Sequence, residues 1–337
     1  MTKASLLKDR AKVLGFCALG IAPAAEDGEM LRRLSLSPRP PYVPWKPEYR
    51  CSPRFWLPEA RSVLVGAVSY LDRYARDYSS PPLGKGYLSP FAWEPDYHEV
   101  VLAKLKQLGD YLEKLQPGTK YILQADNGPG CERLYAWRSG VGWQGKNNFI
   151  VVPNVGSFVW LGLLVTDLEL PPDVPLADQC GACQLCLEAC PTKAYKEDYV
   201  YDYTRCMAYL LTVKKSLSLP QRRALSRHRM IYGCDFCQLA CPHNKPVEDA
   251  PSPWLNVESL LAMPASEFKA FFRRTAASWR GSNVLRRNVV LAAAASGSCL
   301  EVLQKLARGE GLVAETARAV LADIDQEQGP CSCFRCD

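Results

Sequence analysis

The first 172 residues alternate between helical and strand-like patterns of apolar positions. Apolar residues at helical spacing predict helices over residues 5–17 and 97–115, and a shorter helix over residues 134–142. Apolar runs of strand length predict four strands, at residues 62–71, 120–126, 148–153 and 157–170. The last two of these strands are expected to form a hairpin. Residues 1–172 are therefore expected to fold as an α/β domain.

A proline-rich segment over residues 36–58 interrupts this alternation. Because proline lacks a backbone N–H and has a fixed φ, we predict an irregular loop there rather than a helix. The segment also contains several aromatic residues, which favour an ordered loop over a disordered linker.

The pattern changes again after residue 172, where "PPDVPLADQ" marks a boundary before a cysteine-rich module that extends to about residue 250. Beyond this module the pattern is helical, and residues 288–307 with 313–325 resemble one helical hairpin of a HEAT-type array. One such unit would not be stable alone, so we expect the tail to pack on the rest of the chain. The sequence therefore predicts three consecutive domains, over residues 1–172, 173–250 and 251–337.

The composition is typical of a globular protein. The chain has 337 residues, of which 48% are hydrophobic and 23% are charged. No apolar run approaches the length of a membrane span, and the N-terminal residues lack the pattern of a signal peptide. We expect a cytoplasmic protein that is a monomer and has no membrane segment.

Positive charge is concentrated in two stretches, although the formal net charge is only +6. Residues 205–229 and 269–287 contain many Lys and Arg residues and no Asp or Glu. Such stretches are commonly solvated helix faces. Because both lie close to one cysteine-rich module, they are also consistent with a polyanionic partner.

Two motifs hold seven of the fifteen cysteines. The first, at residues 180–191, is C-x2-C-x2-C-x3-C-P, the spacing of bacterial two-cluster ferredoxins, in which three thiolates bind one 4Fe–4S cluster and the fourth binds the other. The second, at residues 234–242, is one cysteine short, and Cys206 is the simplest source of the missing ligand. The ferredoxin rule assigns one cluster to Cys180, Cys183, Cys186 and Cys241, and the other to Cys190, Cys206, Cys234 and Cys237.

A structural zinc site is the alternative interpretation, because C-x2-C pairs also occur in zinc ribbons. Zinc sites do not require the C-x3-C-P ending twice, so two iron–sulfur clusters are favoured. Two adjacent clusters would form an electron relay, which implies an electron acceptor elsewhere in the chain.

The other cysteines lie outside these motifs. Four of them are expected to be small buried hydrophobic residues: Cys17, Cys51, Cys131 and Cys299. The C-x-C-x2-C group at the end of the chain comprises Cys331, Cys333 and Cys336. We expect this group to lie in an unstructured tail, although three thiols could also bind a metal ion together with an outside ligand.

Over residues 40–290 the sequence resembles the cobalamin-dependent tRNA epoxyqueuosine reductases. The similarity rests on both cysteine motifs and on "YRCSPRFWLPEARSVL", "DYHEV", "ADNGPGCERLYAWRSGVGWQGKNNFIVVPNVGSFVWLG", "RCMAYLL", "IYGCDFCQLACPHN" and "SWRG". The family has an N-terminal cobalamin-binding domain, a ferredoxin-like module with two 4Fe–4S clusters and a helical HEAT-like tail, which matches the divisions above. The resemblance implies reduction of epoxyqueuosine to queuosine at the wobble position of a tRNA anticodon, with electrons from a low-potential donor.

The resemblance implies that Asp126 is the catalytic acid, which protonates the departing epoxide oxygen beside the cobalamin. Burial against the corrin is expected to raise the pKa of Asp126, so that the carboxyl stays protonated near neutral pH. The alternative is that Asp126 caps a helix beginning near Pro129. Arg133 is implied as the partner of Asp126 or as a substrate contact, and Lys214 as the best single candidate for a tRNA contact; the alternative for Arg133 is an ordinary surface arginine.

The resemblance also implies a set of cobalamin contacts. Arg50 is expected to pair with a propionamide or phosphate oxygen, and Ser89, which replaces a cysteine found in many relatives, is expected to approach the cobalt face. The remaining implied contacts are Ile150, Leu161, Ala208 and Asp235. None of the three histidines lies in the Asp-x-His-x2-Gly motif that supplies a histidine to cobalt. We therefore expect base-off cobalamin without a histidine ligand.

Two other function classes are considered. A corrinoid reductive dehalogenase would share both cofactors, but such enzymes usually carry an export signal and use a tyrosine as the acid. A non-catalytic two-cluster electron carrier would leave the Asp126 segment and the basic stretches unexplained. The absorption spectrum of anaerobically purified protein mixed with cobalamin separates these classes, because a carrier would show no corrin bands.

Overall fold

The structure is a computed structural model, and it describes residues 1–70, 72, 82–245, 247, 251–295 and 299–327. The chain divides into two compact units. Unit 1 comprises Met1–Tyr74, Pro95–Tyr203 and Asp235–Glu248, and unit 2 comprises Ala75–Glu94, Thr204–Cys234 and Asp249–Asp337. Neither unit is one continuous segment, which differs from the three consecutive domains that the sequence predicts. The terminal group of Cys331, Cys333 and Cys336 lies outside the described residues.

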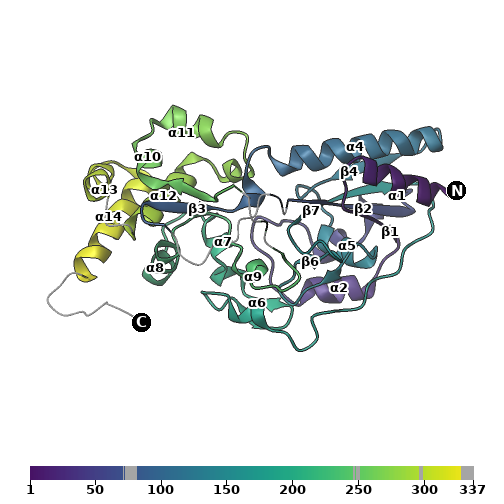
Figure 1. Cartoon of the computed structure of the whole chain (residues 1–337), viewed down its shortest axis with the longest axis horizontal. Helices are drawn as coiled ribbons and strands as arrows, with labels where there is room; N and C mark the ends of the chain where they lie inside the picture. Colours follow the sequence, from purple (N-terminus) through teal and green to yellow (C-terminus); the bar gives the residue numbers. More distant parts are fainter. Residues whose placement is uncertain (71, 73–81, 246, 248–250, 296–298, 328–337) are drawn as a thin grey trace. The chain divides into compact units, whose positions relative to one another are not determined.

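The centre of unit 1 is a four-stranded antiparallel sheet with the order β1-β2-β7-β4 (Figure 1). Its strands are β1 Ala18–Pro23, β2 Ser62–Ser69, β4 Tyr121–Gln124 and β7 Val159–Thr166. The two central strands, β2 and β7, are rich in Val, Leu and Gly and are buried along most of their length. Such continuous burial is expected for strands that are covered on both faces. The predicted strands at residues 62–71, 120–126 and 157–170 are thereby confirmed.

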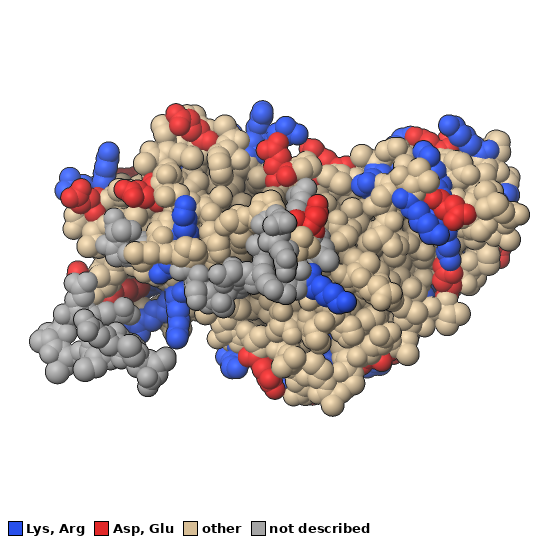
Figure 2. Space-filling model, in the orientation of Figure 1, with Lys and Arg blue, Asp and Glu red and all other residues tan. Residues whose placement is uncertain are grey.

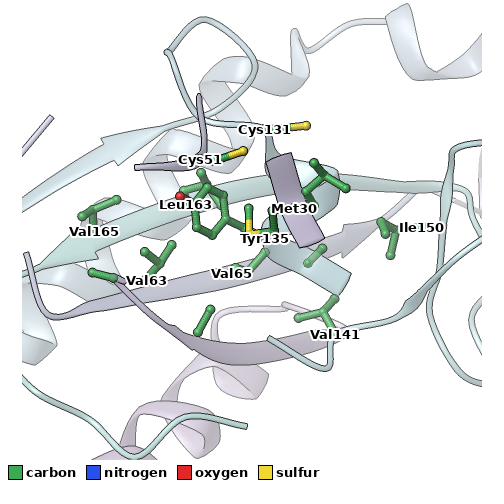
Figure 3. Close-up of a cluster of buried hydrophobic side chains, with 14 of the residues drawn as sticks. Met30, Cys51, Val63, Val65, Cys131, Tyr135, Val141, Ile150, Leu163 and Val165 are labelled. Atoms are coloured by element: carbon green, nitrogen blue, oxygen red, sulfur yellow. The ribbon is translucent and has the colours of Figure 1, made fainter. Parts of the chain in front are cut away.

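Helices cover both faces of this sheet. On one face, α4 Tyr97–Leu115 packs on β7 and on α1 Lys3–Val13. Gly162 permits this close packing, because a Cβ atom there would lie 2.5 Å from Val101 Cγ1 of α4. On the other face, α5 Glu132–Arg138 and α2 Gly28–Ser35 bury a hydrophobic cluster against the sheet, as Figure 3 shows. The cluster includes Met30, Val63, Val65, Tyr135 and Leu163. Successive side chains of β2 point to opposite faces of the sheet, so each face can bury a separate layer of helices.

Two sequence predictions for unit 1 are wrong. The predicted hairpin of residues 148–153 with 157–170 does not form, because β6 Ile150–Val151 pairs instead with β5 Trp143–Gln144. The edges of β7 are both occupied, one by β2 and one by β4, so β7 has no edge left for β6.

The segment expected to be an irregular loop contains helical turns, α3 Pro47–Cys51 and the 3₁₀ helix η1 Pro53–Phe55. Each begins with proline, which is tolerated at the first helical position because the N–H group there has no intrahelical partner.

The first cysteine motif and most of the second belong to unit 1. The short helices α6 Leu185–Glu188 and α9 Phe236–Leu239 contact each other, and β8 Tyr195–Glu197 pairs with β9 Val200–Tyr201. The two motifs are far apart in sequence, so the contact between α6 and α9 brings their cysteines toward one another.

Unit 2 contains a three-stranded sheet with the order β10-β3-β11. Its strands are β3 Lys85–Leu88, β10 Met230–Tyr232 and β11 Trp254–Asn256. The helices before β10 are α7 Met207–Leu210 and α8 Leu219–Arg227, and the 3₁₀ helices are η3 Pro90–Ala92, η4 Tyr203–Arg205, which spans the boundary with unit 1, and η5 Ala276–Arg280. The sheet therefore combines segments from three separate parts of the chain.

The C-terminal part of unit 2 is helical, as the sequence predicts. Its helices are α10 Val257–Ala262, α11 Ala265–Phe272, α12 Ser282–Ala294, α13 Leu300–Ala307 and α14 Gly311–Glu327. The central helix is α12, which contacts α8, α10, α14 and β10 and is buried on most sides. Whether α12–α14 represent a HEAT-type unit stays a prediction. No helix in the described part of the chain is long and apolar enough to cross a membrane.

Candidate functional site

Asp126 lies two residues after the end of β4, at a turn with left-handed backbone geometry (φ 60°). Its backbone N–H donates a hydrogen bond of 2.8 Å to Glu132 Oε1, which fixes the turn. Helix α5 begins at Glu132 with Cys131 as its N-cap residue. The alternative that Asp126 caps this helix is therefore wrong, and its carboxylate is available for another role. Burial and the negative charge of Asp126 raise the pKa of the Glu132 carboxyl.

The Asp126 carboxylate is the end of a chain of three titratable side chains. Its Oδ2 atom lies 3.5 Å from Nε2 of His98, and the side chain is 66% exposed. On the other side of the imidazole, His98 Nδ1 lies 2.6 Å from Asp96 Oδ1. Asp96 is the N-cap residue of α4 and also accepts a hydrogen bond from the His98 backbone N–H. A histidine held between two carboxylates can pass a proton from one side to the other.

Sequence reasoning missed Asp96 and His98 as site residues. The signal in the sequence was "DYHEV", one of the segments that carry the family resemblance. It places an acid, Asp96, and a histidine, His98, at the start of a predicted helix.

The increase in the pKa of Asp126 that is expected from burial against the corrin stays a prediction, and the protein groups around the carboxyl act in the opposite direction. Desolvation does raise the pKa, but the interaction with His98, helped by Tyr97 and Arg133, outweighs it and lowers the pKa below its ordinary value. For His98, desolvation lowers the pKa, and the two neighbouring carboxylates reverse this and raise it above its ordinary value. The contact between the two side chains therefore raises the pKa of His98 and lowers that of Asp126.

We predict that His98 makes stability depend on pH. Because the folded-state pKa of His98 is raised, its contribution is complete below its unfolded value of about 6.5 and is lost as pH rises through the folded-state pKa. His98→Gln should therefore reduce the free energy of unfolding by about 1 kcal/mol at pH 6 and by less at pH 9. Denaturant unfolding at both pH values measures this difference. A deficit of equal size at both pH values would contradict it.

Arg133 is exposed and lies close to the same site. Its Nη1 donates a hydrogen bond of 3.1 Å to the Asn148 carbonyl oxygen, and its guanidinium lies 5.5 Å from the centre of the Phe149 ring. Its charge contributes to the lowered pKa of Asp126. Arg133 is thus an electrostatic partner of Asp126, and contact with substrate stays a prediction.

The predicted cobalamin contacts occupy different environments. Arg50, on α3, has a buried Nε atom that has no hydrogen-bond partner among the described residues. Ile150 is 2% exposed and belongs to the hydrophobic cluster of unit 1, and Leu161 packs against that cluster. Asp235 is buried and accepts a hydrogen bond of 3.1 Å from Gln238 Nε2. In this group, the buried Nε–H of Arg50 is a hydrogen-bond donor that lacks an acceptor among the described residues.

Two further predicted contacts belong to unit 2. Ser89 is completely buried, and its backbone N–H donates to the Tyr232 carbonyl oxygen. Gly233 packs on it with a positive φ of 74°, and a Cβ atom at this glycine would lie 2.4 Å from Ser89 Cβ. Ala208 lies on α7 and is half-buried. The roles of Ser89 and Ala208 in cofactor binding stay predictions.

The four cysteines assigned to the first cluster influence one another electrostatically. Burial, followed by the neighbouring thiols of Cys241, Cys180 and Cys183, raises the pKa of Cys186 to about 11. Cys183 likewise contributes to the raised pKa of Cys241. Cys241 therefore lies near the first motif, although it belongs to the second motif in sequence. A cluster that binds thiolates would offset this mutual repulsion of negative charges.

The set assigned to the second cluster is distributed over both units. Cys190 and Cys237 belong to unit 1, and Cys206 and Cys234 belong to unit 2. Cys190 is buried, and its Sγ atom accepts a hydrogen bond of 3.3 Å from the Ala194 N–H. Among the described residues, no group of three His, Cys, Asp or Glu side chains is arranged to hold a single metal ion. Both cluster ligand sets stay predictions.

A buried hydrogen-bond network fixes the second motif to the α/β part of unit 1. Asn244 Oδ1 accepts from the Ser157 backbone N–H at 2.6 Å, and Asn244 Nδ2 donates to Ser157 Oγ and to the Gln238 carbonyl oxygen. Asn147 Nδ2 donates to the Cys237 carbonyl oxygen at 3.1 Å. Gly156 is required beside this network, because a Cβ atom there would lie 2.2 Å from Asn244 Oδ1. The polar residues of "GKNN" and "CPHN" therefore position the cysteine-bearing loop.

The basic stretches are only partly available to a partner. Lys214 and Lys215 are exposed, whereas Arg222 forms a two-pronged ion pair with Asp323 of α14, with both contacts at 2.8 Å. In the second stretch, Arg274 is paired with Glu94 at 2.9 Å, and Arg287 is buried. Lys and Arg side chains nevertheless gather over α8, as Figure 2 shows.

Comparison with known proteins agrees with these features. A family model described as 4Fe-4S double cluster binding domain matches residues 179–244, and one described as Epoxyqueuosine reductase QueG matches residues 50–126. The epoxyqueuosine reductase of Gloeobacter violaceus is 34% identical over 315 residues, which are 88% of this chain and 98% of the relative. That of Bacillus cereus is 33% identical over 301 residues, which are 84% of this chain and 78% of the relative.

Solved structures give the same result. A crystal structure of selenomethionine-labelled epoxyqueuosine reductase matches with a TM-score of 0.84 and 29% identity, and the match covers 95% of this chain and 90% of that chain. A crystal structure of epoxyqueuosine reductase with a tRNA-Tyr epoxyqueuosine-modified stem loop matches with the same values. The epoxyqueuosine reductase from Streptococcus thermophilus matches with a TM-score of 0.84 over 99% of this chain and 96% of that chain.

A mixed α/β fold that carries a 4Fe–4S binding domain defines the class as an iron–sulfur oxidoreductase. The identity and coverage of the curated relatives specify the family. This chain belongs to the epoxyqueuosine reductase family.

Proposed function

We propose that this protein reduces epoxyqueuosine to queuosine at the wobble position of tRNA. The observation that carries the proposal is the match over 95% of the chain to a reductase structure with an epoxyqueuosine-modified tRNA stem loop. The reaction removes the epoxide oxygen and leaves a carbon–carbon double bond. It therefore consumes two electrons and two protons and releases water.

The electron path of this proposal uses two 4Fe–4S clusters on the eight assigned cysteines, reduced by a low-potential donor. The mutual influence of Cys186 and Cys241 supports the assignment of Cys241 to the first cluster. Cobalamin, when bound, would supply a reduced, electron-rich centre for the reductive opening of the epoxide. Arg50 fits such a cofactor, because its buried Nε needs an acceptor of the kind that a propionamide or phosphate oxygen provides.

The proton path of this proposal uses the side chains of unit 1. Asp126 carries the proton to the departing oxygen as the general acid. His98 lies 3.5 Å from the Asp126 carboxylate and returns a proton to it after transfer, and Asp96 holds the imidazole in position through Nδ1. The exposed Asp126 carboxylate would thereby regain its proton from the half-buried His98 rather than directly from bulk water.

The proposed reaction is tested by incubating anaerobic, cobalamin-loaded protein with epoxyqueuosine-containing tRNA and a low-potential reductant. Nucleoside analysis should show conversion to queuosine. Halide release from chlorinated aromatic compounds, without any queuosine, would instead support a dehalogenase. Protein that carries clusters and binds no cobalamin would support an electron carrier.

We predict that Lys214 and Lys215 contact tRNA phosphates. Both side chains are exposed, and each phosphate contact with single-stranded RNA contributes about 0.7 to the salt dependence of binding. Lys214→Ala with Lys215→Ala should therefore weaken binding and flatten the plot of log affinity against log salt concentration by about one unit. Titrations of an anticodon stem-loop at several salt concentrations measure the slope.

The matched control for this prediction is Lys12→Ala with Lys114→Ala, which removes the same charge from two exposed positions on α1 and α4. An equal change of slope in both double variants would mean that only net charge matters. An unchanged slope in the Lys214 and Lys215 variant would make these lysines a solvated surface.

A further inference from the structure

Trp279 of unit 2 is half exposed, which is unusual for a tryptophan in a helical segment. The side chain is 50% exposed and lies in the 3₁₀ helix η5. The indole Nε1–H donates a hydrogen bond to the Tyr232 hydroxyl group, and Tyr232 is itself 7% exposed on β10. The exposed ring is therefore anchored at its edge to a buried residue. It has a defined orientation before any partner binds.

A cation lies over one face of this ring and is also anchored. The Arg280 guanidinium lies 4.7 Å from the centre of the Trp279 ring. Its Nε atom donates a hydrogen bond of 2.7 Å to the carbonyl oxygen of Thr212. Arg280 thus links the indole directly to the loop that carries Lys214.

Helix α12 fixes this loop through side-chain hydrogen bonds to the loop's carbonyl oxygens. Arg287 Nη2 donates to the carbonyl oxygens of Leu210 and Val213, at 3.2 and 3.0 Å. Asn288 Nδ2 donates to the carbonyl oxygens of Leu211 and Ile231, both at 2.9 Å. Arg287 is only 1% exposed, and its interior position lowers its pKa to about 10. Arg287, the buried last residue of the basic stretch 269–287, therefore fixes the loop that carries the exposed Lys214 and Lys215 relative to Trp279.

This arrangement has the chemistry of a binding surface for single-stranded RNA. Such surfaces combine an exposed aromatic ring, on which a base stacks, with cations that contact the neighbouring phosphates. We propose that Trp279 is a stacking platform for an unpaired base of the anticodon loop, with Arg280 and the Lys214–Lys215 loop positioned for the adjacent backbone. The inference rests on the proposed function, and it adds a base contact to the phosphate contacts assigned to the lysines.

Stacking and phosphate contacts can be distinguished by salt. Trp279→Ala should weaken binding of an anticodon stem-loop by about 5- to 100-fold, the range for loss of one stacked base. The slope of log affinity against log salt should stay unchanged, because no charge is removed. Trp279→Phe should restore most of the affinity, since the ring face is retained. A fully paired RNA duplex should bind the wild type and both variants equally.

The matched control is Trp45→Ala, which removes a tryptophan of unit 1 that is 40% exposed. If Trp279→Ala does not fold, Trp279→Leu keeps an apolar side chain without the aromatic face and gives the same comparison with Trp279→Phe. Equal affinity of wild type and Trp279→Leu or Trp279→Ala for the stem-loop would overturn the platform while leaving the reductase function intact. A wild-type protein that binds no stem-loop and forms no queuosine would overturn both. Loss of binding to a protein partner, with RNA affinity unchanged, would assign the exposed ring to that partner instead.

Discussion

Asp126→Asn should lower the turnover of epoxyqueuosine-containing tRNA by at least about 10²-fold, the loss typical of removing a general acid. Asparagine keeps the shape of the side chain but cannot donate the proton that the departing oxygen needs. The left-handed turn at this position is also compatible with asparagine, so the backbone should not change. Single-turnover assays with nucleoside analysis measure the effect. Cluster content and affinity for tRNA should remain those of the wild type.

The matched control is Asp9→Asn, because Asp9 is an exposed carboxylate on α1 that pairs with Lys12 at 3.4 Å. It should leave turnover unchanged. A variant at position 126 that retains near-normal turnover would mean that the proton reaches the epoxide by another route. If that route were His98 acting alone, His98→Gln combined with Asp126→Asn would then abolish the residual activity.

The lowered pKa of Asp126 changes how this acid must work. A carboxyl that stayed protonated because of burial would need no partner, as the sequence-based expectation supposed. In the structure the carboxylates of Asp96 and Asp126 raise the pKa of His98, and His98 lowers the pKa of Asp126. Turnover in this arrangement requires that Asp126 can donate a proton and that His98 is protonated and can replace it. Turnover should therefore decline as pH rises through the pKa of His98. A cavity that excludes water around the substrate would shift the proton back toward Asp126.

Local sequence patterns predicted helix α4 and three of the four strands of the unit 1 sheet, but not β1 or α2. Helix α4 has the predicted bounds, Tyr97–Leu115, because its apolar residues recur at helical spacing and Asp96 caps it. The central strands were also predictable, since β2 and β7 are continuous apolar runs. The cysteine spacing also predicted the 4Fe–4S binding domain, because C-x2-C-x2-C-x3-C-P is the spacing of two-cluster ferredoxins.

The features that sequence could not give depend on contacts between distant segments. The pairing of β6 with β5 rather than β7 follows from which strands occupy the edges of β7. The contact between His98 and Asp126 depends on how α4 packs across the sheet. The division into two interleaved units has the same origin, because Ala75–Glu94 leaves unit 1 and supplies β3 to the sheet of unit 2.

Cys241→Ser should remove one whole cluster and abolish turnover, because an interrupted relay delivers no electrons. Wild-type anaerobic protein is expected to hold about eight irons per chain, and each cluster-ligand variant about four. The decisive comparison uses two variants from different motifs. Cys186→Ser and Cys241→Ser should leave the same remaining cluster, with identical electron paramagnetic resonance spectra after reduction. This identity follows because the two thiols lie in one electrostatic group although their motifs are separate in sequence.

The controls for this prediction separate the two clusters from each other and from general damage. Cys206→Ala should lose the other cluster and give a different residual spectrum. Cys17→Ser should retain about eight irons, because Cys17 of unit 1 is exposed, and the sequence-based prediction that it is buried is wrong. Different residual spectra for Cys186→Ser and Cys241→Ser would contradict the crossed ligand assignment. Zinc at about two per chain, without visible charge-transfer absorption, would contradict iron–sulfur clusters altogether. The crossed assignment therefore requires that substitution of Cys241, from the second motif, removes the same cluster as substitution of Cys186, and not the cluster bound by its sequence neighbour Cys237.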